Sequence, residues 1–234
     1  MKAVAIVQHQ ADDNPAYLAT FLERAGIAYC LFRPDLGEAL PGSIRDYAGY
    51  ALLGGNISVN DQLSYQSQEM ALIVEAIAAD IPVIGHCLGG QLMAKALGAE
   101  VSSAPYPEIG WQPLHPLHAA AHDWFGRTTP WIQFQWHKEM FALPPNARLL
   151  ARSQYCEHQA FDVNAKHLAM QFHCEVNAAK VRAWLSSDTH DFYQCAGPGV
   201  QTTDRVLTQL EDNIVISQQI ADAIYTRWSQ GLSR

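Results

Sequence analysis

The amino-acid sequence predicts an α/β protein with an open, mostly parallel twisted sheet, helices on both faces, added antiparallel strands and a C-terminal helix. Short apolar runs alternate with amphipathic helical segments over residues 3–98, which is the rhythm of strand–helix–strand units. Residues 99–172 then hold short strand-like runs separated by Pro and Gly, as expected for antiparallel strands joined to a parallel core. A helical stripe of apolar residues occupies the end of the chain.

Four apolar runs are expected to form the parallel strands. They comprise residues 3–7, 27–32, 50–53 and 81–84. Short apolar runs of this kind, bounded by Gly, Pro or Asp, are typical of strands that are buried on both faces.

Three helices are expected to connect and follow these strands. The first has Asn14 as its cap and Pro15 in its first turn, and Gly26 closes it. The second covers residues 64–79, where apolar side chains recur at steps of three and four residues. The third covers residues 88–97 and ends at Gly98.

The C-terminal part is expected to be helical. Asn177 is expected to cap a helix over residues 178–186. We divide the chain into an α/β domain at residues 1–190 and a helical extension at residues 191–234. One stripe of the extension, which Ser217 alone interrupts, carries Leu207, Leu210, Ile214, Ala221, Ile224 and Trp228. The stripe is expected to dock on the domain or to form a homodimer contact, and docking is preferred because apolar stripes usually bury within their own chain.

Composition limits the class of protein. The chain has 234 residues, of which 49% are hydrophobic and 16% charged, so it can bury a large core. A net charge of −8 without any long basic run argues against nucleic acid or an anionic membrane as a partner. No apolar stretch approaches the length of a membrane span, and the N-terminus reads as a strand rather than a signal peptide. The five cysteines show no Cys-x-x-Cys spacing, so we expect free thiols and a cytoplasmic location.

The sharpest motif is the heptapeptide Gly-His-Cys-Leu-Gly-Gly-Gln at residues 85–91. A buried strand runs into Cys87, and small residues follow where a helix begins, as a strained strand–turn–helix elbow requires. The helix N-terminus favours a thiolate, and the N–H group of Leu88 can donate to an oxyanion formed beside it. Gln91 lies one helical turn further on the same face, where it could bind a substrate. A lone buried cysteine would be the plainer interpretation, but the whole motif favours a nucleophile.

A base for this nucleophile is offered by residues 168–175, an apolar strand that ends in His-x-Glu. Residues two apart on a strand point to the same side, so His173 and Glu175 can address one site. A cysteine nucleophile needs such a base and a group that orients it.

These motifs make the chain resemble the class I glutamine amidotransferases, in particular stand-alone proteins similar to the amidotransferase domain of GMP synthase. The family elbow Gly-x-Cys-x-Gly-x-Gln matches residues 85–91, and Gln-Phe-His-Pro-Glu matches residues 171–175 except that Cys174 replaces the proline. The Gly-Gly-Pro oxyanion loop of the family aligns with residues 54–56, where Asn56 replaces the proline. The resemblance covers about residues 1–190 and implies the flavodoxin-like class I amidotransferase fold.

The resemblance also implies roles for individual residues. Cys87, His173 and Glu175 would form the catalytic triad, and the N–H groups of Gly55 and Leu88 would form the oxyanion hole. The family places a substrate-binding segment at Gln135, Trp136 and His137, beside Gln91. No cofactor and no metal is expected.

Other candidate residues receive structural interpretations. His137-Lys138-Glu139 is a second His-x-Glu, but His173 is the preferred base because it ends an apolar strand. Glu108, beside Gly110, is expected to fix backbone N–H groups. Several residues could ligate a metal, but their spacings match no tight zinc pattern: Cys156, His158, His173, Cys174 and His190.

The predicted activity is hydrolysis of the γ-glutamyl amide of glutamine, or of another γ-glutamyl compound, through a thioester on Cys87. The sequence has no Gly-Lys-Ser/Thr phosphate motif, so ATP binding is not expected. Without a synthetase in this chain, an ammonia acceptor is expected to be a separate synthetase subunit, or there is none. The alternative within the enzyme class is a γ-glutamyl peptidase or hydrolase that releases an amine. A catalytically idle regulatory relative and a redox sensor at Cys87 are the non-enzyme alternatives; the redox sensor gives no reason for the pair His173 and Glu175.

Overall fold

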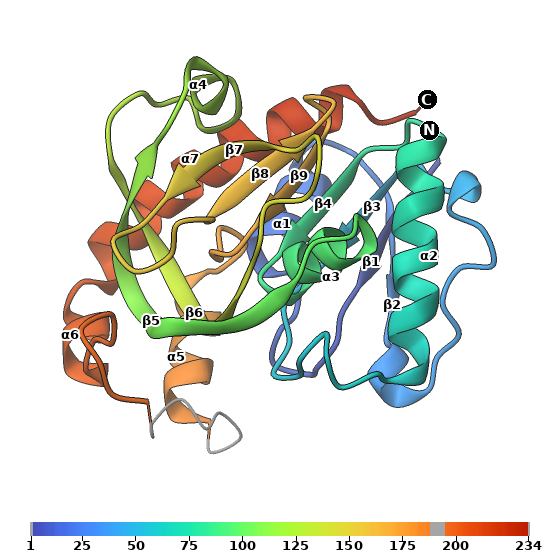
Figure 1. Ribbon diagram of the computed structural model, residues 1–234. Helices are drawn as coiled ribbons and strands as arrows, with labels where there is room; N and C mark the ends of the chain where they lie inside the picture. The colour runs from blue at the N-terminus through green and yellow to red at the C-terminus, as the bar shows by residue number, and fades with distance from the viewer. Residues whose placement is uncertain (1, 188–194, 234) are drawn as a thin grey trace.

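The computed structural model describes residues 2–187 and 195–233, which form one mixed sheet covered by helices (Figure 1). The sheet has nine strands in the order β2-β1-β3-β4-β9-β8-β7-β5-β6. The fold class predicted from the sequence is confirmed, because a parallel half is extended by antiparallel strands and helices cover both faces. The predicted boundary between 190 and 191 and the candidate ligand His190 lie outside the described residues.

The parallel half of the sheet consists of five strands. They are β1 (Val4–Val7), β2 (Tyr29–Phe32), β3 (Gly49–Leu52), β4 (Val83–His86) and β9 (His167–Met170). Strands β1, β3, β4 and β9 are buried along their whole length, as their apolar runs predict. Strand β4 begins two residues later than predicted, because the N–H of Ile81 still bonds the carbonyl of Ala76 at the end of the preceding helix.

The antiparallel half contains longer strands than the sequence suggests. Its members are β5 (Val101–Pro116), β6 (Trp131–Phe141), β7 (Arg148–Arg152) and β8 (Ala160–Val163). We expected short runs broken by proline, but β5 is continuous over 16 residues. The register between β5 and β6 shifts between Ser103 and Glu108, so Pro105 and Pro107 fall where the ladder is interrupted and their missing N–H groups leave no bond unmade.

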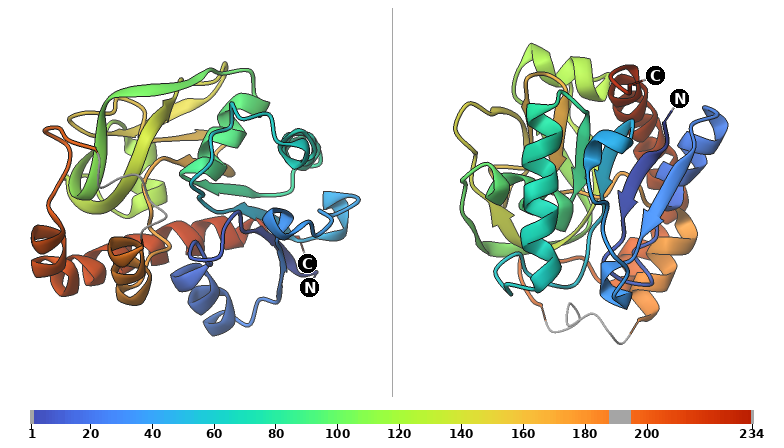
Figure 2. Two further views of the ribbon diagram at one scale, coloured as in Figure 1. Left: turned by 90° about the horizontal axis from the view of Figure 1, so that it is seen from below. Right: turned by 90° about the vertical axis from the view of Figure 1, so that its right-hand side faces the viewer.

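Helices pack on both faces of the sheet. Helices α2 (Ser64–Ala78) and α3 (Leu88–Ala96) bury apolar side chains against one face, and α1 (Ala16–Arg24) and α4 (Ala119–Phe125) bury theirs against the other. Figure 2 shows α2 on one side of the parallel strands and α1 with the C-terminal helix on the other. Two short 3-10 helices, Pro34–Leu36 and Ile44–Asp46, lie between β2 and β3. Helix α4 had no predicted counterpart, because seven residues are too few to show a helical period.

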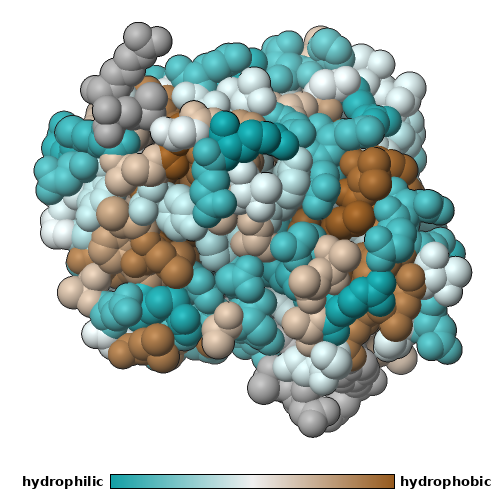
Figure 3. Space-filling view, turned by 180° about the vertical axis from the view of Figure 1, so that it is seen from behind, coloured by the Kyte–Doolittle hydropathy of each residue, from teal (hydrophilic) through white to brown (hydrophobic). Residues whose placement is uncertain are grey.

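The described residues of the C-terminal chain include the helices α5 (Ala178–Ser186), α6 (Thr203–Thr208) and α7 (Leu210–Gln230). Asn177 caps α5 by accepting a hydrogen bond from the N–H of Lys180. In α7, Ala221, Ile224 and Trp228 pack into the same core as α1 and α4. Leu210 and Ile214 pack into a separate cluster with Trp184 of α5, and Ser217 is buried between the two groups. The outer face that includes α1 and α7 shows interspersed hydrophilic and hydrophobic residues (Figure 3). A homodimer contact stays a prediction.

Among the described residues, none of the helices combines the length and the apolar character that a bilayer crossing requires.

Candidate active site

The candidate site lies where several parallel strands end. Cys87 follows β4 directly, Gly54 and Gly55 follow β3, and His173 follows β9 after two intervening residues. Open α/β sheets bind ligands outside the carboxyl ends of their strands, and the topology brings these segments to that edge.

Cys87 occupies the strained turn that the motif predicts. Its φ of 48° and ψ of −107° are unusual for a residue other than glycine, and it is the residue that precedes α3. Small neighbours make the turn possible: a Cβ on Gly85 would lie 2.5 Å from the backbone of Gly89, and one on Gly90 would lie 2.6 Å from the carbonyl oxygen of Met170. The elbow is therefore packed backbone against backbone, with the Cys87 thiol at the N-terminus of a helix.

His173 and Glu175 lie in the turn after β9 rather than on the strand. The strand ends at Met170, because its partner strand β4 ends at His86 and helix α3 begins at Leu88. The last backbone bond between the two segments runs from the N–H of Cys87 to the carbonyl of Met170. His173 is held instead by its N–H, which donates to the carbonyl of Phe134 on β6 at 2.9 Å. The prediction that a strand would aim both side chains is thus wrong in detail, although both side chains reach one site.

The imidazole and the carboxylate form a buried pair. The Nδ1 atom of His173 lies 2.7 Å from the Oε1 atom of Glu175, and both side chains are almost fully buried. Nε2 of His173 makes no hydrogen bond to oxygen or nitrogen of the described residues. Burial alone would lower the pKa of His173, but the charges of Glu175 and the Cys87 thiolate raise it to about 10. The environment therefore favours an imidazolium, which carries a proton on Nε2.

Two further charged residues, Lys180 and Asp13, complete the cluster. The ammonium of Lys180 lies 3.2 Å from Oε1 of Glu175, forms an ion pair with Asp13 and donates to the carbonyl of Asn14 at 2.8 Å. Burial would raise the pKa of Glu175, yet Lys180 and His173 lower it well below its usual range. Neither residue was predicted from the sequence. The sequence does offer one indication of a buried charge: Lys180 lies one turn before Trp184 on the apolar face of α5.

The predicted oxyanion donors lie next to each other. A Cβ on Gly55 would lie 2.9 Å from Cδ2 of Leu88, and one on Gly54 would lie 2.9 Å from Cε1 of His173. Within the described part of the chain, the N–H groups of Gly55 and Leu88 donate no hydrogen bond. They are therefore free to donate to a ligand.

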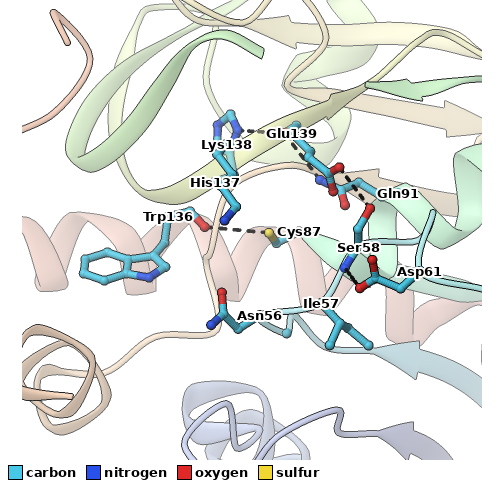
Figure 4. Close-up of a pocket in the computed structure, with 11 residues that line it drawn as sticks. Asn56, Ile57, Ser58, Asp61, Cys87, Gln91, Trp136, His137, Lys138 and Glu139 are labelled. Carbon is cyan, nitrogen blue, oxygen red and sulfur yellow. Dashed lines mark hydrogen bonds between the residues drawn. The ribbon is translucent and has the colours of Figure 1, made fainter. Parts of the chain in front are cut away.

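Two adjoining hollows expose these groups. A cavity of about 200 Å³ is lined by Cys87, Gly55 and Gln91 among others, and a gap of about 10 Å³ is lined by Cys87, His173 and Gly55. Figure 4 shows the Cys87 sulfur beside the carbonyl of Trp136, 3.9 Å from it, with Gln91 and Glu139 further along the cavity. The thiol thus faces both the larger cavity and the His173 ring.

The predicted substrate-binding residues are not all at the cavity. Gln91, Trp136 and His137 line it, and the amide of Gln91 donates to the carbonyl of Glu139 and to Oε1 of Gln171. Gln135 does not line it; its buried amide donates instead to Oε1 of Gln159 at 3.2 Å.

Glu108 contacts His137, one of the residues that line the cavity. Its Oε2 atom lies 3.2 Å from Nε2 of His137 and accepts hydrogen bonds from the side chains of Ser153 and Gln159 at 2.8 and 2.7 Å. We expected it to fix backbone N–H groups, but its bonds are to side chains. His137, in the second His-x-Glu, is therefore engaged by a carboxylate other than that of Glu139.

A group of potential metal ligands lies behind the elbow. Ligand atoms of His86, Cys174 and Glu175 come within 4.8 Å of one another, and among the described residues no other such group was found. The Tyr225 hydroxyl lies 3.0 Å from Nε2 of His86 and 3.4 Å from the Cys174 sulfur, and burial raises the pKa of the Cys174 thiol well above its usual range. A protonated thiol engaged by a hydroxyl is a poor metal ligand, so the group is better described as an internal hydrogen-bond network.

Comparison with known proteins identifies similar chains. Residues 26–187 match the family described as Glutamine amidotransferase class-I. The chain is 30% identical over 207 residues, 83% of its length and 84% of the relative's, to the glutamine amidotransferase-like protein YfeJ of Salmonella typhimurium. It is 33% identical over 144 residues to the GMP synthase of Aeropyrum pernix, of which that match spans only 26%. A crystal structure of a glutamine amido transferase from Methylobacillus flagellatus superposes with a TM-score of 0.95 at 38% identity, covering 100% of this chain and 96% of that one.

The buried ion cluster generates a prediction about stability. Lys180→Met should lower the free energy of unfolding by about 3–5 kcal/mol, because it leaves the carboxylates of Asp13 and Glu175 in the interior without their cation. Urea unfolding followed by circular dichroism measures the change. The control is Lys166→Met, whose partner Asp80 is mostly exposed and which should cost at most about 1 kcal/mol. Equal effects of the two substitutions would contradict a charged cluster.

Proposed function

The chain belongs to the class I glutamine amidotransferase family, and we propose that it acts as a cysteine-dependent amidase on the γ-glutamyl amide of glutamine. The observation that carries the proposal is the arrangement around the thiol. Cys87 and His173 line one small gap, and His173 is held by Glu175 at 2.7 Å. A nucleophile, a base and an orienting carboxylate in this order are the parts that acyl transfer through a thioester needs.

The first chemical step is attack of the Cys87 thiolate on the carbonyl carbon of the substrate amide. A carbon–sulfur bond forms, and the electron pair of the carbonyl bond moves to its oxygen. The N–H groups of Gly55 and Leu88 stabilise this oxyanion, since neither is otherwise bonded within the described chain. The imidazolium of His173 stabilises the thiolate before the attack.

In the second step the tetrahedral intermediate collapses. The electron pair on the oxygen reforms the carbonyl, the carbon–nitrogen bond breaks, and His173 donates its Nε2 proton to the departing nitrogen, which leaves as ammonia. A water molecule then attacks the γ-glutamyl thioester while neutral His173 accepts its proton, and glutamate is released with the Cys87 thiolate restored. The ammonia either enters solution or passes to a separate synthetase.

A substrate survey tests the proposal. The native chain should release ammonia from free glutamine, and Cys87→Ala should abolish the release, because Cys87 is the only thiol among the described residues that line the gap with His173. Ammonia and amine release are measured in parallel for glutamine and for γ-glutamyl dipeptides. Cys30→Ala, an exposed cysteine on the outer strand, is the matched control and should keep full activity.

The survey also separates the proposal from its rivals. A strong preference for the dipeptides would reject the ammonia-releasing function in favour of a γ-glutamyl hydrolase. Hydrolysis that persists in Cys87→Ala would rule out Cys87 as the nucleophile, and inactivity of the native chain on every compound would favour an idle relative.

The protonation of His173 predicts a pH dependence. For glutamine, kcat/KM should fall as pH rises through about 10, because His173 then loses the proton that the leaving nitrogen requires. Glu175→Gln should move this fall to lower pH, because it removes the carboxylate whose charge raises the pKa of His173. The measurement is kcat/KM against pH, with the exposed Glu157→Gln as control. An alkaline fall at the same pH in Glu175→Gln and the native chain would refute the role of the pair.

A further inference from the structure

A second buried histidine–glutamate pair lies beneath the loop that carries Gly54 and Gly55. His9 follows β1, and Glu69 belongs to α2; both side chains are fully buried. Nε2 of His9 lies 2.8 Å from Oε1 of Glu69, and Nδ1 lies 3.0 Å from the carbonyl oxygen of Gly54. The pair lines neither hollow of the site, so it makes no direct contact with a ligand there.

The two partners fix the protonation of His9. A carbonyl oxygen can only accept a hydrogen bond, so Nδ1 of His9 carries a proton and donates to Gly54, while Nε2 is held by Glu69. Burial by itself would lower the pKa of His9, but Glu69, the Gly54 carbonyl and Asp13 raise it overall. The contact with the carbonyl oxygen therefore makes Nδ1 of His9 the donor to Gly54.

The Gly54 carbonyl and the Gly55 N–H belong to the same peptide group. A trans peptide is planar, and its C=O and N–H bonds point in opposite directions. Among the described residues no peptide bond is cis. By holding the carbonyl, His9 therefore directs the Gly55 N–H away from itself, toward the hollows that Gly55 lines.

The neighbouring contacts hold the loop in the same position. A Cβ on Gly55 would lie 3.0 Å from Cβ of His9, so the loop packs directly on that residue. The next N–H along, that of Asn56, donates to Oε1 of Gln10 at 2.6 Å. Asn56 stands where the resembled family has proline, which has no N–H and a fixed φ. In this chain side chains from the β1 end restrain the loop instead.

We propose that His9, held by Glu69, is a positioning residue that keeps the Gly55 N–H turned into the oxyanion hole, and that Gln10 secures the following peptide. His9 lies outside the residues 26–187 that match the family, so the match does not assign it a role. The kinetic part of the inference rests on the proposed amidase function. The structural part, the orientation of the peptide between Gly54 and Gly55, does not.

The structural test compares crystal structures of the native chain and of His9→Phe. Phenylalanine keeps the ring but removes the donor to Gly54, so the peptide should rotate or become disordered and the Gly55 N–H should leave the cavity. His9→Phe also leaves Glu69 buried without a partner, which could prevent folding. The double variant His9→Phe/Glu69→Leu removes that charge, still lacks the donor and should show the same peptide change.

The kinetic test uses glutamine hydrolysis. Loss of one oxyanion donor lowers kcat by about 100–1000-fold in a well-studied protease, so His9→Phe and the double variant should lose about 10–1000-fold in kcat. KM should change by less than about threefold, because the interaction exists only after the carbonyl is attacked. His9→Asn, whose amide can donate to the Gly54 carbonyl, should recover most of the loss. His167→Phe, at a buried histidine that begins β9, is the matched control and should stay near the native rate.

The outcomes separate the two proposals. If the native chain hydrolyses no γ-glutamyl compound, the proposed function fails, and the crystal structures alone decide the inference. The inference is overturned if the peptide keeps its orientation in the variants without the donor, or if an active enzyme keeps its kcat within about twofold in the double variant. It is also overturned if His9→Asn and His167→Phe lose as much kcat as His9→Phe.

Discussion

The site depends on the close backbone packing of the turn between β4 and α3. Gly85, Gly89 and Gly90 allow backbone to touch backbone, and that packing holds Cys87 at a positive φ that is about 1–3 kcal/mol unfavourable for a residue with a side chain. The surrounding strands β3 and β9 are fully buried and leave the turn no room to relax. This turn places the sulfur at a helix N-terminus, near Gly55 and Leu88, whose N–H groups donate no hydrogen bond within the described part of the chain.

Buried charges of alternating sign connect this turn to the rest of the fold. Asp13 contacts Lys180, Lys180 contacts Glu175, Glu175 contacts His173, and His173 faces Cys87. Isolated charges in an interior are costly, whereas an alternating series lets each charge stabilise the next. The series also sets the protonation states that the proposed reaction needs. The lowered pKa of Glu175 keeps its carboxylate a hydrogen-bond acceptor, and the raised pKa of His173 keeps its imidazolium a proton donor.

The features that could be predicted from the sequence are those that depend on residues close together in the chain. The glycine spacing around Cys87 and the apolar runs of the parallel strands need only neighbouring residues, so the fold class and the elbow could be predicted. The residues that hold the site could not, because their partners are distant in sequence: Lys180 from Asp13, and His9 from Glu69. The periodicity of apolar residues does not show which strands pair or in which register. The long pairing of β5 with β6 could not be predicted, because the prolines of β5 argue against a continuous strand, although they lie where the ladder is interrupted.

A crystal structure of the protein treated with a chloroketone analogue of glutamine tests the central claim most directly. The claim is that Cys87 attacks a γ-glutamyl carbonyl whose oxygen then lies between two backbone donors. The predicted result is a covalent bond from the Cys87 sulfur to the analogue, with its oxygen within hydrogen-bond distance of the Gly55 and Leu88 N–H groups. An analogue attached to another cysteine, or an oxygen directed away from both N–H groups, would contradict it.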